Sequence, residues 1–340
     1  MSDSQFVRRV LIVIGLVALA WFAWILRGVL LMVFGAVVVA TLFRAIAALF
    51  QKLGMNRGLS LALAVLSVFT VVITGVVLFG NQIATQAASL VQAIPAAWES
   101  LQQRLDDFGL AAQLEQINPA GQLRTITAGI GSFAMSLGGA LANTLLIVVG
   151  GIFIAASPAF YTIGLVKLVP GPRRHLFSGA LDDSGKALQL WLKAQVLAMI
   201  GVGIVTGLGL WLVGMPSAFA LGLIAGLLEF IPYAGPILAA IPAVLIALAI
   251  DPQLALWVVG VYVVVQQIEG NLLQPLLQQW AVDLPGAVLL FSLLACGTLF
   301  GALGVIFAAP LTVVIYVLVK RLYVQEALNT PTPIPGEDQE

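Results

Sequence analysis

Two carboxylates interrupt the apolar C-terminal half of the sequence, and they are the first candidates for chemistry. Glu229 precedes two prolines, Pro232 and Pro236, and Glu269 lies inside the apolar run 254–277. A carboxyl group is costly in hydrocarbon, so such groups normally face a cavity, a partner or a proton pathway. We therefore expect at least one of the two to carry or gate a proton. The competing interpretation for Glu229 is structural: it would pair with backbone groups where the helix breaks.

The segment around the two prolines cannot be a regular helix. Pro232 and Pro236 lack backbone N–H groups and disfavour a helix before them, so carbonyls of the preceding turn lose their partners. Unpaired backbone is tolerated at membrane depth only where it is buried in protein or lines a wet cavity. We therefore expect a site for a polar solute or an ion, formed by Glu229 with Pro232, Tyr233, Gly235 and Pro236.

Amide side chains gather around Glu269, from Gln266 to Gln279. At about 100° per residue, Glu269 projects from the side of the helix opposite to four amides that fall within about 60° of one another: Gln267, Asn271, Gln274 and Gln278. Amides donate and accept hydrogen bonds without net charge, which suits a neutral polyhydroxylated solute or contacts between helices. Four amides on one face of the helix favour a path for a solute over contacts between helices alone.

Two apolar runs, 218–250 and 286–319, are too long for one straight crossing. As a helix, either would span about 50 Å, whereas the hydrocarbon core is about 30 Å thick. The second run contains its own helix breakers, Gly297, Gly301, Gly304 and Pro310. Each run is therefore either a broken span or a hairpin. We expect the break at 232–236 and the glycines Gly297 and Gly301 to meet near the bilayer midplane, because discontinuous segments of transporters commonly converge on the substrate site.

The overall composition places these groups in a membrane. Of 340 residues, 61% are hydrophobic and 9% are charged, against roughly 45–50% and 25% in a soluble domain, and the mean hydropathy is +1.08. This predicts an all-α polytopic membrane protein. The 15 basic and 15 acidic residues cancel, which gives no indication of a nucleic-acid partner.

The sequence does not support an enzyme, a metal site or a cofactor. It contains one histidine, His175, and one cysteine, Cys296, so neither a His cluster nor an intramolecular disulfide can form. Motifs for a nucleophile elbow, a zinc protease and a phosphate-binding loop are missing. We therefore predict no catalytic residues, no cofactor, and transport that runs on a gradient rather than on ATP.

Apolar runs and charged segments divide the chain. We expect three N-terminal transmembrane helices in 1–79, an amphipathic segment in 80–139, a transport core in 140–327 with a loop at 166–193, and a disordered tail at 328–340. In the core, the fourth apolar run, 140–165, precedes the loop. The other apolar runs are 10–26, 28–43, 59–79 and 196–213.

The basic residues set the expected orientation. Segments 44–57 and 166–193 are basic, whereas 80–139 carries mainly acids. Short loops rich in Lys and Arg remain in the cytoplasm. We therefore place both termini inside and 80–139 outside.

The candidate residues also form motifs that follow one another along the chain. The motifs are Glu229-Phe-Ile-Pro-Tyr-Ala-Gly-Pro236, Gln267-Ile-Glu-Gly-Asn-Leu-Leu-Gln-Pro275, Val282-Asp-Leu-Pro285 and Phe300-Gly-Ala-Leu-Gly304 with Ala309-Pro310. With these motifs, residues 6–328 resemble a known family, the autoinducer-2 exporters, which implies a place in a bacterial inner membrane. The chain departs from the family pattern at Ser157, Ala194 and Gly286.

This resemblance implies about eight membrane segments, homo-oligomers and efflux of small solutes. The substrate is the furanone autoinducer-2 in some members and sodium or lithium, exchanged for protons, in others. The first hypothesis is therefore a secondary exporter of a small polar solute. The alternatives are a cation/proton antiporter and a non-transporting membrane scaffold.

Overall fold

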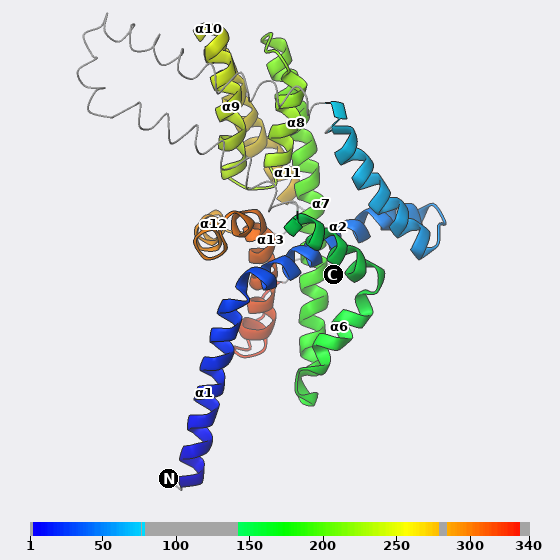
Figure 1. Cartoon of the computed structure of the whole chain (residues 1–340), viewed down its shortest axis with the longest axis vertical. Coiled ribbons are helices and arrows are strands. Elements are labelled where there is room, and N and C mark those ends of the chain that lie inside the picture. Colours follow the sequence, from blue (N-terminus) through cyan, green and yellow to red (C-terminus); the bar gives the residue numbers. More distant parts are fainter. Residues whose placement is uncertain (1–2, 76, 79–141, 279–283, 334–340) are drawn as a thin grey trace, which may run out of the picture.

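The computed structural model describes residues 3–75, 77–78, 142–278 and 284–333, and within these ranges all regular structure is helical (Figure 1). Five helices are long and apolar enough to cross a membrane, or six if one bent pair is counted as a span. The expected all-α membrane fold is confirmed, while the expected count of eight segments is not. The amphipathic segment predicted at 80–139 lies outside the described residues.

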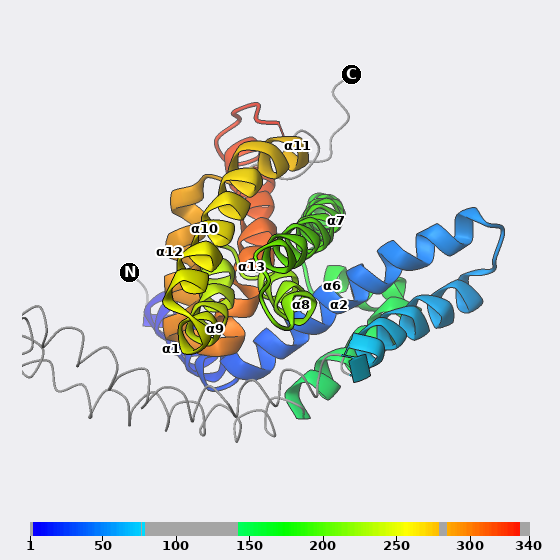
Figure 2. The ribbon, with the colours of Figure 1, turned by 90° about the horizontal axis from the view of Figure 1, so that it is seen from above.

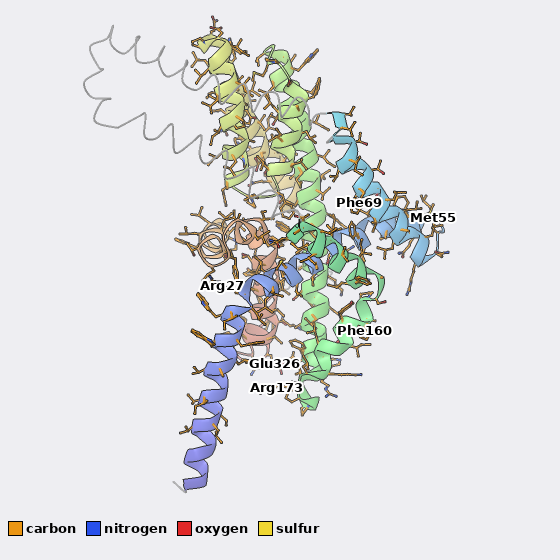
Figure 3. All side chains as sticks on the ribbon, in the orientation of Figure 1. Arg27, Met55, Phe69, Phe160, Arg173 and Glu326 are labelled. Atoms are coloured by element: carbon orange, nitrogen blue, oxygen red, sulfur yellow. The ribbon has the colours of Figure 1, made fainter. Side chains whose placement is uncertain are left out.

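The helices of residues 174–319 gather into one bundle, from whose side the helices Arg27–Lys52 and Arg57–Gly75 extend (Figure 2). Met55 and Phe69 lie on this extension, whereas Arg173 and Glu326 lie at one end of the bundle (Figure 3). The candidate residues belong to the bundle.

The N-terminal part begins with α1 (Asp3–Ile25) and α2 (Arg27–Lys52). The Arg27 guanidinium lies 4.3 Å from the Trp24 ring centroid at their junction. The basic loop expected at 44–57 is shorter than predicted, because α2 continues to Lys52 with Phe43, Ala45 and Ala47 buried. The Asn56 side chain then accepts a hydrogen bond from the Leu59 N–H, 2.8 Å, and so caps the next helix.

The fourth apolar run is not one straight crossing. It forms the helix Ala142–Ala156 and α6 (Pro158–Lys167), which meet at an angle of 88°. Ser157 has φ −137° and ψ 59° and so leaves the helical region, as expected for a residue before proline.

The long helix α7 (Arg174–Leu212) corrects the expected loop at 166–193. Its 39 residues correspond to about 58 Å. Its buried residues include Ala180, Ser184, Leu188 and Trp191, whose spacing of three or four keeps one face of the helix against the core. The charged residues between them, which favoured a loop, occupy the remaining faces.

The two overlong runs fold as pairs of helices. The first forms α8 (Ala218–Leu228) and α9 (Ala234–Ile250). The second forms α12 (Gly286–Phe300) and α13 (Ala302–Val319), separated by Gly301 alone. A Cβ atom at Gly304 would meet the carbonyl of Cys296, and one at Gly297 would lie 3.0 Å from Val305. Because these contacts join residues on opposite sides of Gly301, α12 and α13 form a hairpin.

Glycines hold α8 close against α7. A Cβ atom at Gly222 would lie 2.6 Å from the Gly207 Cα, and one at Gly226 would lie 3.0 Å from the Gly203 Cα. Small residues four apart on both helices let the backbones approach, as they do in many membrane helix pairs. This crossing fixes the first half of the α8–α9 pair.

After α9, helix α10 (Pro252–Ile268) continues into a π-helical turn, Glu269–Leu273, and then α11 (Gln274–Gln278). Asp251 caps α10 by accepting from the Leu254 N–H, 3.3 Å. A Cβ atom at Gly201 of α7 would lie 3.4 Å from Leu273. The π-helical turn therefore lies against α7.

Residues 328–333 of the expected disordered tail fold back on the end of α13, which corrects that prediction for this part. Helix α13 ends in a π-helical turn, Lys320–Gln325. Lys320 donates to the Pro333 carbonyl, 3.2 Å, and Gln325 donates to the Thr332 carbonyl, 2.6 Å. Arg321 pairs with Asp183 of α7, 3.4 Å. Residues 334–340 lie outside the described part.

Candidate functional site

Glu229 lies between two hydrophobic cores and is 4% exposed. Leu228 packs against the core formed by α7 to α10, while Phe230 packs against the core formed around α2, α7 and α13. The Phe230 ring meets the Trp191 ring edge to face, with 5.9 Å between centroids. The position of Glu229 is therefore fixed from both sides.

An amide of α7 holds the backbone of Glu229. Helix α8 tightens as it ends, because the Ile231 N–H donates to the Leu228 carbonyl, three residues back, at 2.9 Å. The Glu229 carbonyl instead accepts from the Gln195 side chain, 2.6 Å. Gln195 thus satisfies a backbone group at the break, as a membrane interior requires.

The structure brings Glu229 and Glu269 together. Their carboxyl groups lie close enough for their charges to interact. Within the described ranges, the Oε2 atom of Glu229 is buried without a hydrogen-bond partner. Glu269 instead accepts from two amides, Gln266 at 2.7 Å and Gln274 at 3.2 Å. The two carboxyls therefore differ in environment although they are neighbours.

The π-helical turn overturns the single amide stripe predicted from a regular helix. A π-helix closes its hydrogen bonds over five residues instead of four, so Gln274 turns toward Glu269, five residues earlier. Asn271 donates instead to the Gln267 side chain, 2.9 Å, and to the Gln267 carbonyl, 3.0 Å. The amides form two groups, and Glu269 belongs to one of them. Nothing is described of the Gln278 side chain.

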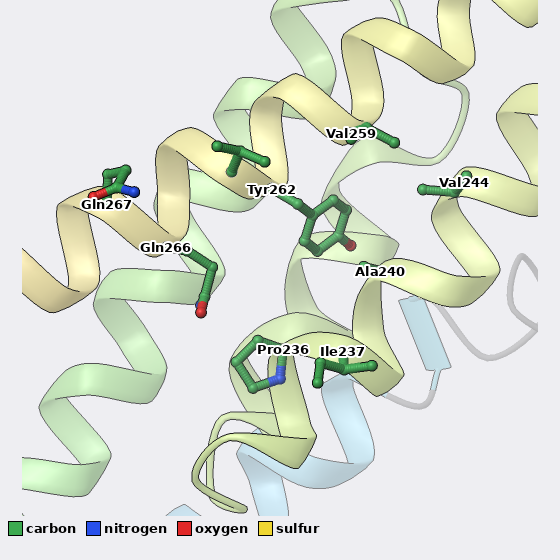
Figure 4. A pocket seen from close by; sticks show the side chains of 9 residues that line it. Pro236, Ile237, Ala240, Val244, Val259, Tyr262, Gln266 and Gln267 are labelled. Carbon is green, nitrogen blue, oxygen red and sulfur yellow. The ribbon is translucent and has the colours of Figure 1, made fainter. Parts of the chain in front are cut away.

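A groove of about 370 Å³ lies between α9 and α10 (Figure 4). The Tyr262 hydroxyl in its wall donates to the Ala239 carbonyl, 3.1 Å, in the helix that Pro242 disturbs. Gln266 lines the groove and also donates to Glu269. The lining residues are mostly apolar: Pro236, Ile237, Ala240, Val244, Val259, Tyr262, Val263, Gln266 and Gln267.

Most other predicted residues of the first break have structural roles. Tyr233 has φ 63°, and its hydroxyl lies 2.9 Å from the Cβ position of Gly286 at the start of α12. A Cβ atom at Gly235 would collide with the Leu228 carbonyl. The Pro232 carbonyl accepts from the Ala234 N–H, 2.7 Å, and Pro236 lines the groove. Close packing therefore accounts for Gly235.

The two breaks pack on the same core, but no direct contact between Gly235 and Gly301 is described. Phe230 beside the first break and Phe300 and Leu303 beside the second all pack against the core that contains Trp191. Gly297 lies against Val305, whereas a side chain at Gly301 would meet open space. Neither Gly235 nor Gly301 lines the groove between α9 and α10.

Sequence reasoning missed two residues that the geometry makes important, Gln195 and Tyr262, and named a third, Gln266, only as one of the amides around Glu269. Gln195 holds the break, Gln266 joins the groove to Glu269, and Tyr262 supports α9. Gln195 is a polar side chain in an apolar part of α7, which was a usable signal. No such signal marks the π-helical turn, because its sequence is compatible with a regular helix.

Comparisons with known protein sequences identify a family and several relatives of this chain. The model of a family described as AI-2E family transporter matches residues 11–323. YrrI of Bacillus subtilis (strain 168), provisionally named a transport protein, is 34% identical over 176 residues, 48% of this chain and 50% of YrrI. This chain thus spans about half the length of YrrI.

Two further relatives differ in how much of the chain they match. MT0215 of Mycobacterium tuberculosis (strain CDC 1551 / Oshkosh), also provisionally named a transport protein, is 26% identical over 317 residues, 89% of this chain and 85% of MT0215. TqsA of Escherichia coli (strain K12), named an AI-2 transport protein, is 31% identical over 125 residues, 35% of this chain and 36% of TqsA. Since the family match covers nearly the whole chain and several helices can cross a membrane, this multi-pass membrane protein belongs to the AI-2E transporter family.

Proposed function

We propose that this protein is a secondary-active exporter of a small polar solute of the class of autoinducer-2, driven by protons. Its setting would be a bacterial inner membrane with both termini in the cytoplasm, in a homo-oligomer. The observation that carries the proposal is the double role of Gln266, which lines the groove and donates to Glu269. One side chain thereby joins a candidate solute site to a candidate proton site.

The groove has the size and chemistry for a small solute. Its volume of about 370 Å³ lies in the range of about 300–1,000 Å³ that small-molecule sites occupy. Aliphatic walls such as Ile237 and Val259 would cover the carbon skeleton, while Gln266 and Gln267 offer amides at one end. Amides both donate to and accept from hydroxyl groups.

Competition for Gln266 provides a coupling mechanism. The Gln266 amide binds Glu269 most strongly when that carboxyl is ionised. A proton on Glu269 weakens this bond and frees the amide for a solute hydroxyl. By linkage, a solute that occupies Gln266 alters proton binding at Glu269 by the same free energy.

Transport in proteoliposomes tests the proposal. We expect autoinducer-2 to accumulate only when a proton gradient is imposed. Gln266→Leu removes the amide that would bind a solute hydroxyl, a neutral hydrogen bond of about 0.5–1.5 kcal/mol, so KM rises roughly twofold to tenfold. Gln51→Leu makes the same chemical change at an exposed position near the end of α2 and should leave transport unchanged.

A sodium or lithium/proton antiporter is the second candidate, because two adjacent carboxyls suit a cation as well as a proton. The same vesicles separate the two functions when internal pH is followed with a dye. If a sodium gradient moves protons and autoinducer-2 does not accumulate, the exporter proposal is wrong. If neither solute moves, the non-transporting scaffold replaces both.

A further inference from the structure

We propose that the corner between α6 and α7 binds an anionic phospholipid, with the phosphate on Lys167 and Arg173 and the acyl chains along α6. This corner lies apart from the groove between α9 and α10 and shares no lining residue with it. The lipid site therefore does not depend on which solute is transported.

Helix α6 exposes apolar side chains on its outer side. Tyr161, Leu165 and Leu168, spaced four and three residues apart, share one side of the helix, and their exposed fractions are 39%, 50% and 82%. The Phe160 ring, also exposed, meets the Tyr161 ring edge to face, with 5.4 Å between centroids. Within the described ranges no residue of α6 is buried. Such a surface is more stable against acyl chains than against water.

The direction of α6 suits the surface of a bilayer. It lies at 88° to the preceding apolar helix, Ala142–Ala156. A helix perpendicular to a membrane-crossing neighbour runs along the membrane surface, where interfacial helices turn their apolar side toward the acyl chains. The other side of α6 packs on α7 (Figure 1), so lipid would cover the outer side.

Basic side chains gather where α6 turns into α7. The Arg174 guanidinium folds back on the end of α6, donating from Nε to the Val169 carbonyl, 2.9 Å, and from Nη2 to the Lys167 carbonyl, 3.3 Å. The Arg173 N–H donates to the Pro170 carbonyl, 3.0 Å, and so closes the turn. These bonds fix the connection and hold the exposed Lys167 and Arg173 at the same end of α6.

This basic cluster, Lys167, Arg173 and Arg174, is available to an anion from outside the protein. In the part of the chain that the structure describes, the ion pair that forms joins Arg321 to Asp183 and includes none of the cluster. A guanidinium can bind two phosphate oxygens at once, and an ammonium adds further donors. Basic residues beside an apolar membrane segment are attracted to anionic lipids.

A cavity of about 150 Å³ between α6 and α7 places the phosphate more closely. Lys167 lines this cavity together with two hydroxyl side chains, Thr162 and Ser178, and one carboxylate, Asp182. The Asp182 charge repels an anion that enters deeply. The phosphate would therefore lie at the outer rim, beside Lys167 and on the side of Arg173.

Native mass spectrometry of the purified full-length protein in a neutral detergent measures bound lipid. We expect phosphatidylglycerol to bind roughly tenfold more tightly than phosphatidylcholine, which has no net charge. The double variant Lys167→Gln with Arg173→Gln should weaken phosphatidylglycerol roughly thirtyfold, at about 1 kcal/mol for each basic residue. The matched control, Lys52→Gln with Arg57→Gln, removes two exposed cations near the end of α2 and should leave this affinity nearly unchanged.

Two single variants separate lipid binding from a loss of folding. Asp182→Asn removes the opposing charge but keeps an acceptor, so it should tighten phosphatidylglycerol several-fold, a gain that misfolding cannot produce. Leu168→Asn should weaken phosphatidylglycerol several-fold, because an exposed apolar contact with the acyl chains is lost. Glycerol phosphate, which has the anion without acyl chains, should bind the wild-type protein far more weakly than the lipid does.

The opposite results contradict the site. Equal affinity for the two lipids, an equal loss in the control, or no gain in Asp182→Asn would leave only nonspecific attraction. Glycerol phosphate bound as tightly as the lipid would assign the cluster to a free anion. A Leu168→Asn protein that loses oligomers instead of lipid in the same spectra would show that a second copy covers α6. A wild-type protein that binds no phosphatidylglycerol would mean that another part of the chain covers it.

Discussion

Gln195 holds the break after α8 in place by supplying a side-chain donor where the helix no longer supplies a backbone donor. Its amide donates to the Glu229 carbonyl from a different helix, at 2.6 Å. The bond therefore joins α7 to the residue that carries the buried carboxyl. Interhelical hydrogen bonds of this kind are modest in energy, but this one fixes the position of a candidate proton site.

We expect Gln195→Leu to destabilise the protein by about 0.5–2 kcal/mol, because the Glu229 carbonyl loses its donor inside the membrane. Thermal unfolding in detergent measures the change, with Gln51→Leu as the control. Unchanged stability of Gln195→Leu would show that water or another group satisfies this carbonyl.

At this scale the sequence predicted the important residues but not their partners. Glu229 and Glu269 were identifiable because ionisable residues in apolar runs are rare. That Gln274 faces Glu269 depends on one π-helical turn, whereas the pair of Gln267 and Asn271, four residues apart, fits a regular helix. The extra residue in that turn rotates the later side chains, and a count at 100° per residue cannot anticipate it.

Among the elements, the glycine-lined crossing of α7 and α8 tolerates the least change. Gly222 lies against backbone atoms of Gly203 and Gly207, which cannot move aside as a side chain could. The apolar runs and their breaks were predictable from composition. The glycine crossing and the helical start of α7 were not, because each depends on which neighbour covers the helix.

Gly222→Ala should lower stability by about 1–3 kcal/mol through overpacking. Gly260→Ala, in α10 with open space around its Cβ position, should be neutral or slightly stabilising. Thermal unfolding of both variants gives the comparison. Equal unfolding temperatures of the two variants would indicate that α7 and α8 can move apart without a loss of stability.

The turn at Gly301 is limited by backbone conformation rather than by space. It has φ 67° and ψ −147°, a region that is nearly exclusive to glycine. We expect Gly301→Ala to cost about 1–3 kcal/mol although nothing lies near the new Cβ atom. Unfolding measured beside Gly260→Ala tests this, and a loss no larger than that control would contradict it.

The arrangement of the whole molecule in the membrane stays a prediction from its charges. Reporters fused near Arg173 and at the C-terminus should read inside, and a reporter near Gln113 should read outside, because Lys and Arg concentrate in the former regions. Alkaline phosphatase and fluorescent-protein fusions check this. A reporter near Gln113 that reads inside would contradict the predicted topology.

Helix α7 carries two distant contacts on one stiff rod. Asp183, which pairs with Arg321, and Gln195, which holds Glu229, lie on the same unbroken helix, about 18 Å apart along its axis. A straight helix transmits rotation and translation with little loss. A displacement of the end of α13 that moves Asp183 would therefore also move Gln195. The movement would reach Glu229 through the backbone of α7, without any chain of intervening side chains.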